Sequence, residues 1–364
     1  MREGGCRVTT GNNVAVAMSG GVDSSMAAYY LKAQGCTVFG ITGVMWGKGD
    51  VGAHEVVKDA RRACAQLSID YFTIDLRAEF ERNVLRYFKS EYLEGRTPSP
   101  CVLCNSRIKF GVLLDAALDK GADRLATGHY ARSRRGEDAI MHLFKGVDES
   151  KDQSYFLFDL NQGQLENSVF PLGDTTKAEV RKDAAAIGLD SRRSRESNEL
   201  CFIPDQDYVR WIEARAGKEA FKTGRIVDAE GRKLGLHGGV HRYTVGQRKG
   251  LGIATGSPMY VASIDGCTGE VVVGQRDRAL TRSMAVTDIN WIGGPPEDRV
   301  FEAEVKIRYN HGGARCSVEI EDGLAHVTFD EPQFAVTPGQ VAVFYDGLEV
   351  IGGGFILGRQ RVTG

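Results

Sequence analysis

A short segment at residues 18–25 combines two glycines, three serines and an aspartate in the order Met-Ser-Gly-Gly-Val-Asp-Ser-Ser. An apolar run precedes it and an amphipathic stretch follows it. Glycines let the backbone turn tightly and approach an anion, hydroxyls can bind that anion, and the first N–H groups of the new helix point to the same place. The segment therefore predicts a phosphate-binding loop at a strand-to-helix turn. The alternative is a glycine-rich turn that leads into an ordinary Ser or Asp helix cap.

Two better-known nucleotide motifs do not fit. The Gly-x4-Gly-Lys-Ser/Thr loop of kinases and GTPases requires a lysine that residues 18–25 lack, and Gly47-Lys48-Gly49 fails its spacing. Segment 250–256, Gly-Leu-Gly-Ile-Ala-Thr-Gly, misses the dinucleotide fingerprint by one residue. The predicted phosphate loop is thus of another kind.

Three cysteines are candidates for sulfur chemistry. Cys101 and Cys104 lie in a proline-containing segment that an apolar-periodic stretch follows, so we expect Cys104 near the start of a helix. There the helix dipole and the nearby cations Arg107 and Lys109 favour the thiolate, which predicts a reactive sulfur. Cys201 occurs in a short apolar run, which by itself is more typical of a small core residue.

The order of elements from about residue 14 to 190 is that of an α/β domain. Strands are expected at Val14–Met18, Thr37–Thr42 and Asp70–Asp75, with helices at Ser24–Gln34 and His54–Leu67. This βαβαβ order predicts a parallel sheet with helices on both faces and ligands at the carboxyl ends of the strands.

After about residue 215 the pattern changes to short β-branched runs broken by glycine. Strands are expected at Gly224–Asp228, Met259–Ile264, Glu270–Gly274, Phe301–Arg308, Ala325–Phe329 and Val341–Tyr345. Helical periodicity is nearly absent here. We therefore expect two small all-β units, split near Asp288–Pro296.

The composition limits the class of protein. The chain has 364 residues and a formal net charge of −2, which argues against a surface covered in positive charge but leaves room for a local basic face. Forty-five glycines beside 9 prolines indicate many tight turns rather than low complexity. The N-terminus has no apolar core of signal-peptide length and no stretch approaches the ~18 apolar residues of a membrane span, so we expect a cytoplasmic protein.

Six motifs occur in one order along the chain and together resemble one family. They are Ser19-Gly-Gly-Val-Asp-Ser24, Arg96-Thr-Pro-Ser-Pro-Cys-Val-Leu-Cys-Asn105, Ala126-Thr-Gly-His-Tyr130, Lys151-Asp-Gln-Ser-Tyr-Phe156, Cys201-Phe-Ile203 and Thr244-Val-Gly-Gln-Arg-Lys-Gly-Leu-Gly252. The first resembles the PP-loop of ATP pyrophosphatases. The whole set, from about Val14 to Gln360, resembles the tRNA-specific 2-thiouridylases (tRNA-uridine 2-sulfurtransferases).

The resemblance implies a three-part architecture. It implies a PP-loop ATP-binding catalytic domain with a Rossmann-like, adenine nucleotide alpha hydrolase-like parallel sheet at residues 1–215. A small central β domain at 216–285 and a C-terminal β-barrel at 286–364 follow, both binding tRNA.

The resemblance also implies the chemistry. ATP adenylates O2 of the wobble uridine, because the C2 carbonyl is otherwise a poor electrophile, and sulfur then attacks C2. Cys201 carries the sulfur as a persulfide, and Cys104 releases the product by forming a disulfide with Cys201. Asp23 helps to hold Mg²⁺, and a sulfur donor or relay protein supplies the sulfur.

Further residues take roles from the same resemblance. Contacts to ATP are implied for Ala17, Met18, Ser19, Gly20, Gly21, Val22, Asp23, Ser24 and Gly128, with the adenine near Gly43. Contacts to the target base fall on Ser99, Pro100 and Cys101. Contacts to the rest of the tRNA fall on His129, Lys151, Asp152, Gln153, Arg308, Tyr309 and Gln340.

One position departs from the family pattern. Many members have aspartate three residues before the catalytic cysteine, where this chain has Cys101. Cys101, Cys104 and Cys201 could therefore supply three thiolates to a [4Fe–4S] cluster whose fourth iron binds sulfide. Zinc would need a fourth ligand that the spacing does not mark. The persulfide and cluster routes both remain open at this point.

Basic residues are concentrated in segment 221–250. It holds seven Lys or Arg against two acidic residues, with His237, His241 and Tyr243 between them. Given the resemblance, we expect this strip to hold tRNA phosphates; the alternative is a solvated charged face. Two further basic groups are expected to grip the anticodon arm, namely Arg181 with Lys182, and Arg192, Arg193 and Arg195.

Two other classes of protein compete. An amide-forming PP-loop ligase of a small metabolite would use the same loop but has no need of Cys104 and Cys201. A non-catalytic RNA-binding protein would not need Asp23 or either cysteine. A dependence of ATP consumption on tRNA distinguishes the first class from the expected function.

Overall fold

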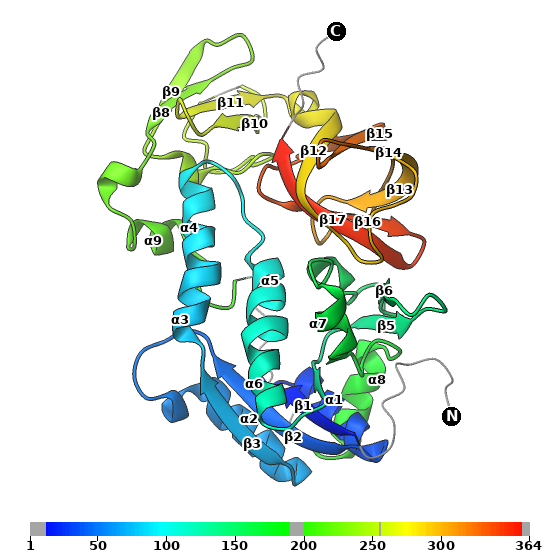
Figure 1. The fold of residues 1–364 in the computed structure, drawn as a ribbon. Helices are drawn as coiled ribbons and strands as arrows, with labels where there is room; N and C mark the ends of the chain where they lie inside the picture. The colour runs from blue at the N-terminus through cyan, green and yellow to red at the C-terminus, as the bar shows by residue number, and fades with distance from the viewer. Residues whose placement is uncertain (1–11, 190–199, 255, 359–364) are drawn as a thin grey trace.

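A computed structural model describes residues 12–189, 200–254 and 256–358 (Figure 1). Its first unit is built on a five-stranded parallel sheet in the order β3-β2-β1-β4-β7. The strands are β1 (Asn13–Ala17), β2 (Thr37–Val44), β3 (Asp70–Asp75), β4 (Arg124–Ala126) and β7 (Ser168–Val169). The chain adds β2 and β3 on one side of β1 and then β4 and β7 on the other. The loops after β1 and β4 therefore meet at the switch point of the sheet, where α/β folds bind ligands.

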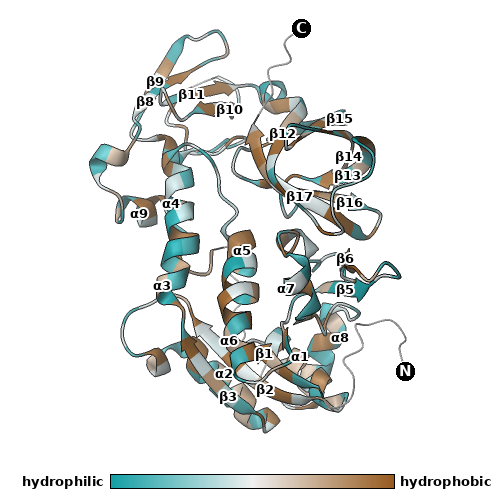
Figure 2. Ribbon diagram, viewed as in Figure 1, coloured by the Kyte–Doolittle hydropathy of each residue, from teal (hydrophilic) through white to brown (hydrophobic). Residues whose placement is uncertain are grey.

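Helices cover both faces of this sheet and confirm the expected α/β class. They are α1 (Val22–Ala33), α2 (Glu55–Leu67), α3 (Arg77–Phe80), η2 (Glu81–Leu85), α4 (Arg86–Leu93), α5 (Pro100–Leu103), η3 (Cys104–Leu113), α6 (Leu114–Asp119), α7 (Gln162–Glu166) and α8 (Lys177–Ala186). Helix α2 buries Val57, Ala60, Ala63, Cys64 and Leu67, the apolar stripe that predicts it. Polar and apolar residues likewise alternate along the helical column from α5 through η3 to α6 (Figure 2).

A kinked helical segment, the cysteine helix, carries the first two candidate cysteines. Helix α5, the π-helical segment η3 and α6 are consecutive in sequence from residue 100 to 119 and lie upright in the middle of the molecule (Figure 1). Gly111 interrupts the helical geometry with φ −104° and ψ −107°. A π-helix bonds residue i to i+5, so side chains five positions apart come close to one face. Cys104 and Lys109 have this spacing.

The central β unit follows α9 (Tyr208–Glu213). Its four-stranded sheet has the order β10-β11-β8-β9. The strands are β8 (Gly224–Val227), β9 (Lys233–His237), β10 (Tyr260–Asp265) and β11 (Glu270–Gly274). A small core of Ile226, Tyr243, Leu251, Val261, Val271 and Val273 holds it together.

The last unit is a closed antiparallel barrel, as expected. Its strands are β12 (Leu280–Trp291), β13 (Val300–Lys306), β14 (Ala314–Glu321), β15 (Leu324–Phe334), β16 (Val341–Asp346) and β17 (Glu349–Gly358), and β12 closes the ring by pairing with both β15 and β17. Strand β12 runs through Asp288, so the sheet does not divide there. Short helical turns complete the chain at η1 (Val51–Ala53), η4 (Ser154–Phe156), η6 (Lys218–Ala220), η7 (Val240–Arg242) and η8 (Arg276–Ala279).

A hairpin of the first unit extends the barrel sheet. Strands β5 (Ala131–Arg135) and β6 (Met141–Lys145) pair with each other, and β6 pairs with β17 through Glu349 opposite Phe144. The hairpin was not expected, because strand pairing between residues about 200 positions apart leaves no local signal.

Within the described part of the chain, no helix is long and apolar enough to cross a membrane.

We predict that this junction is sensitive to pH. His142 Nδ1 lies 2.6 Å from Glu349 Oε1 and Nε2 lies 3.2 Å from Asp138 Oδ2, and hydrogen bonding to Glu349 raises the pKa of His142. The stabilisation is complete below the unfolded pKa of about 6.5 and disappears as the pH rises through the raised folded pKa. Urea unfolding should show that His142→Gln costs at most about 1 kcal/mol at pH 5 and less at pH 8.5. A cost that does not change with pH would contradict the prediction.

Candidate active site

The loop after β1 has the geometry of an anion cradle. The backbone N of Met18 donates to Ile41 O at 2.9 Å and Thr42 Oγ1 donates to Met18 O at 2.6 Å, so strand β2 fixes the start of the loop. Gly20 has φ +74°, and a Cβ there would lie 2.4 Å from Asp59 Cβ. Only glycine fits this position, because both the backbone angle and the neighbouring helix exclude a side chain.

Serine hydroxyls hold the turn together. Ser24 Oγ and Ser25 Oγ donate to Gly21 O at 3.1 and 2.9 Å, and Ser19 N donates to Ser24 Oγ at 3.2 Å. Gly21 is the N-cap of α1 and no side chain caps this helix. The ordinary helix-cap alternative requires a side chain that caps the first N–H groups of α1. No side chain does so, and these N–H groups are therefore not taken by a cap.

The segment after β4 connects the loop with the cysteine helix. A Cβ on Gly128 would lie 2.9 Å from the backbone carbon of Asp23, so Gly128 packs directly against the loop. The next residue, His129, has Nε2 3.4 Å from Lys109 Nζ on the cysteine helix and Nδ1 2.7 Å from Thr127 Oγ1. Three consecutive residues thus bridge the phosphate loop and the candidate thiols.

His129 is neutral and held in one tautomer. Burial, and then the charge of Lys109, lower its pKa well below the usual value. Because an ammonium only donates, Nε2 accepts from Lys109 and Nδ1 carries the proton that Thr127 Oγ1 accepts.

Asp23 has two partners that the sequence did not reveal. Tyr130 Oη donates to Asp23 Oδ1 at 2.8 Å. Lys177 Nζ lies 2.5 Å from Asp23 Oδ1 and 2.7 Å from Oδ2. The phosphate loop lacks a lysine in its own sequence, and α8 brings one to it from 154 positions along the chain.

The three cysteine thiols share one neighbourhood. Cys104 and Cys101 lie one helical turn apart and partly buried, and the exposed Cys201 is close enough for both to raise its pKa. Lys109 lowers the pKa of all three thiols. Cys104 Sγ also lies 3.9 Å from Met45 Sδ, beyond the end of β2.

The expectation that Cys104 is a thiolate is wrong for the free protein. Helix α5 begins four residues earlier at Pro100, so the helix start is not at Cys104. Burial raises the pKa of the Cys104 thiol to about 11, and Lys109 offsets only part of this. At neutral pH this sulfur is therefore a thiol.

The donor groups differ in how well they suit a metal. Within the described residues, no three His, Cys, Asp or Glu side chains form a group that would hold a metal ion. The Asp23 carboxylate and the adjacent serine hydroxyls are hard oxygen donors that suit Mg²⁺; in this structure the carboxylate is paired with Lys177.

Three family models match the chain in sequence. They are the tRNA methyl transferase HUP domain at residues 12–205, the tRNA methyl transferase PRC-barrel domain at 215–275 and the aminomethyltransferase beta-barrel domain at 281–356. The first alone spans just over half of the chain.

Relatives of known name extend along nearly the whole chain. The tRNA-specific 2-thiouridylase MnmA of Geotalea uraniireducens is 49% identical over 355 residues, which is 94% of each chain. The MnmA of Geobacter metallireducens is 47% identical, over 94% of this chain and 96% of the relative. The chain belongs to the tRNA-specific 2-thiouridylase family. This confirms the resemblance, the fold class and the expectation of a sulfurtransferase enzyme.

In this 2-thiouridylase the expected base contacts lie where the three units meet. Ser99 and Pro100 are buried and Cys101 is partly buried at the start of the cysteine helix. Gln340 of the barrel donates to the carbonyls of Thr97 and Pro98 at 3.1 Å each. Gln340, expected to contact tRNA, thus positions the segment that leads to the expected base contacts.

The three side chains of segment 151–153 differ in their exposure to solvent. Lys151 is exposed, but Asp152 is buried and accepts hydrogen bonds from Gly146 N and from both N and Oγ of Ser154. Gln153 accepts from Tyr130 N at 3.1 Å. Among these three residues, Lys151 is the one whose side chain can reach a large ligand.

The remaining expected contacts are placed as follows. Arg308 donates to Phe334 O at 3.2 Å. The ring of Tyr309, in the turn between β13 and β14, has its centre 4.7 Å from that of Phe156 in η4. A Cβ on Gly43 would lie 2.7 Å from Leu76 Cδ1, the end of a flexible side chain, so a small shift of Leu76 would make room for it.

The basic strip at 221–250 has less positive charge available for tRNA phosphates than its net charge suggests. His237, His241 and Tyr243, which occur between the cations in sequence, are buried, so their rings do not lie on the surface of the strip. Four of the cations form ion pairs with carboxylates: Lys222 with Glu94, Arg225 with Glu270, Arg232 with Asp228 and Arg242 with Glu213. Arg248 and Lys249 are exposed. Arg181 and Lys182 are exposed on α8, while Arg192, Arg193 and Arg195 lie outside the described residues.

Proposed function

We propose that this protein uses ATP to convert the wobble uridine (U34) of tRNA into 2-thiouridine. The observation that carries the proposal is the segment at residues 127–130. Gly128 packs against the phosphate loop and His129 contacts the helix of Cys104, so activation by ATP and transfer of sulfur take place in one site. An amide-forming ligase has no use for this connection.

The first step activates the base. The loop at residues 18–25 binds the phosphates of ATP and Asp23 binds Mg²⁺, which supplies charge neutralisation of the phosphates when bound. O2 of the uridine attacks the α-phosphorus, the bond to the pyrophosphate breaks, and pyrophosphate leaves. The C2 oxygen then carries AMP, a good leaving group. The segment Ser99–Cys101 positions the base.

The second step transfers sulfur. The terminal sulfur of a Cys201 persulfide attacks C2, and AMP leaves with the oxygen. Cys104 then attacks Cys201 Sγ, and the bond between Cys201 Sγ and the transferred sulfur breaks. The electron pair stays on the transferred sulfur, which gives 2-thiouridine and a Cys104–Cys201 disulfide. A dithiol reductant, and a sulfur donor or relay protein, must restore the enzyme.

The iron–sulfur alternative has its own test. The exposed position of Cys201 suits delivery of sulfur by a partner, which favours the persulfide. Anaerobic purification followed by iron and sulfide analysis and a visible spectrum distinguishes the two routes. A colourless, iron-free and active enzyme is the result we expect; an activity that follows the iron content would establish the cluster.

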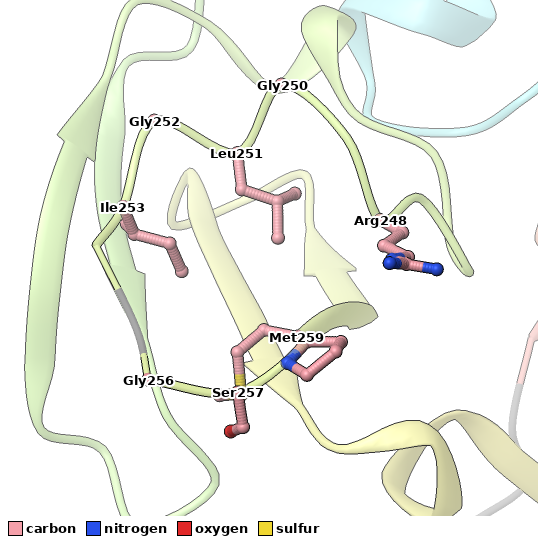
Figure 3. A pocket seen from close by; sticks show the side chains of 9 residues that line it. Arg248, Gly250, Leu251, Gly252, Ile253, Gly256, Ser257 and Met259 are labelled. Carbon is pink, nitrogen blue, oxygen red and sulfur yellow. The ribbon is translucent and has the colours of Figure 1, made fainter.

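We place the tRNA across the three units and the enzyme in the cytoplasm. The first domain boundary lies at residues 215–216. The second lies before Leu280, where strand β12 of the barrel begins, rather than at the expected 285–286. A hollow of about 450 Å³ in the central unit presents Arg248 at its rim (Figure 3). Its position fits contact with the tRNA backbone rather than chemistry, since the phosphate loop and the cysteines lie in the first unit.

Replacement of Arg248 and Lys249 by alanine should weaken tRNA binding and lower its salt dependence. Each lost phosphate contact reduces the slope of log K against log salt by about 0.7–0.9, so we expect a decrease of between one and two. Filter binding over a range of salt concentrations measures this. Lys58 and Arg61, exposed on α2, are the matched control pair. An unchanged slope in the test variant would refute the prediction.

The function as a whole is tested in cells. Mass spectrometry of tRNA from a deletion strain should show loss of 2-thiouridine at the wobble position, and the gene should restore it. Purified protein should release pyrophosphate from ATP only when tRNA is present. Pyrophosphate release that depends on a carboxylate and ammonia would instead establish the ligase.

A further inference from the structure

The phosphate loop presents an electrostatic difficulty. Residues 18–25 contain no cation and one carboxylate, Asp23, yet the proposed substrate carries a polyphosphate. Like charges within about 4–6 Å oppose each other strongly unless a cation lies between them. The structure supplies such a cation from outside the loop, namely Lys177.

The backbone of Lys177 is fixed by hydrogen bonds at the start of α8. Its backbone N donates to Asp148 Oδ2 at 2.9 Å, and a capping box formed by Thr176 and Glu179 defines the start of α8. Its Nζ lies 5.8 Å from the centre of the Tyr130 ring. Backbone position and the direction of the side chain are therefore set by contacts that do not involve a nucleotide.

Among the hydrogen bonds and ion pairs of the described residues, the ammonium group of Lys177 is bound only by the phosphate loop. Both carboxylate oxygens of Asp23 contact Nζ, and the side chain is 20% exposed. A lysine side chain is a compact point charge on a flexible stem, so Nζ can exchange one oxygen anion for another with a small movement.

We propose that Lys177 is the phosphate-binding lysine of this ATP site. In the nucleotide-free protein Asp23 holds it beside the loop, and on binding it passes to the terminal phosphates of ATP. The same movement releases the Asp23 carboxylate as an oxygen donor for Mg²⁺. This inference rests on the proposed binding of ATP at this loop and assigns the residue that neutralises the phosphates.

The test compares ATP with AMP by isothermal titration calorimetry, with Mg²⁺ and without tRNA. We expect Lys177→Gln to lower the affinity for ATP at least tenfold and that for AMP less than twofold, because AMP lacks the terminal phosphates. Lys177→Arg should retain ATP affinity within about threefold, since it retains the charge. Lys145→Gln is the matched control, because Lys145 forms a similarly buried pair with Glu304 at 3.0 Å in another part of the molecule.

Each result decides the matter. ATP affinity unchanged in Lys177→Gln, or equal losses for ATP and AMP in a variant with wild-type thermal unfolding, overturns the role of Lys177 and leaves the proposed function standing. A wild-type protein that binds no ATP overturns both. A variant that unfolds at lower temperature is judged by Lys177→Arg, in which lost ATP binding contradicts a role based on charge.

Discussion

Cys201→Ser should form no 2-thiouridine, with activity below about 1% of the wild type, and should still release pyrophosphate in a tRNA-dependent single turnover. The reason is that Cys201 carries the transferred sulfur but takes no part in adenylation. Mass spectrometry of the digested tRNA and a pyrophosphate assay measure the two steps separately. Cys267→Ser is the matched control, since Cys267 is also exposed but lies in the turn between β10 and β11.

Cys104→Ser should stop the reaction one step later. The sulfur bonded to C2 then remains joined to Cys201, so we expect a covalent adduct of tRNA and protein that dithiothreitol cleaves. Gel electrophoresis with labelled tRNA detects it. Thiolation by Cys201→Ser at the wild-type rate would contradict the persulfide route, whereas the absence of an adduct in Cys104→Ser would contradict only the role of Cys104.

Gly20→Ala should lower ATP affinity by at least about 100-fold. The positive φ of +74° costs a non-glycine residue about 1–2 kcal/mol, and the new Cβ would lie 2.4 Å from Asp59 Cβ and 2.7 Å from the Asp59 backbone. The backbone of α2 cannot move away easily, so the loop must shift and lose the geometry that binds phosphate. Calorimetry with ATP measures the loss.

A second glycine separates strain from steric conflict. Gly231 has φ +79°, and a Cβ at this position would meet no atom within 4 Å, so Gly231→Ala carries the backbone cost alone. We expect Gly231→Ala to lower stability by about 1 kcal/mol and to leave ATP affinity unchanged. If Gly20→Ala bound ATP as the wild type does, the tight packing of the loop against Asp59 would have no part in nucleotide binding.

Local patterns were sufficient for the elements that carry the nucleotide site. The apolar run, the glycine pair and the helix at 13–33 are contiguous, and β1, the loop and α1 lie where the sequence predicts them. The stripe of α2 and six strands of the two β units, namely β8, β10, β11, β13, β15 and β16, were also predicted, whereas β9, β12, β14 and β17 were not. Each successful prediction used a signal within a single element, such as an apolar run, a glycine pair or a helical stripe.

Distant contacts left no such signal. The pairing of β6 with β17 and the bonds from Gln340 to the segment of Thr97 join parts of the chain far apart in sequence. Lys177 is an ordinary residue at a helix start until α8 packs beside α1. Nothing in the spacing of residues predicts which lysine lies within reach of Asp23.

The ionisation of the thiols was also decided by the tertiary structure. From the sequence, Arg107 and Lys109 beside Cys104 favour a thiolate, whereas burial in the folded chain outweighs Lys109 and raises the pKa. The sequence by itself determined which residues are available for the chemistry, because residue types, motifs and element periods are local. The tertiary structure decided which of them meet and which charge each one carries, because desolvation and electrostatic pairing depend on every group that packs around a site.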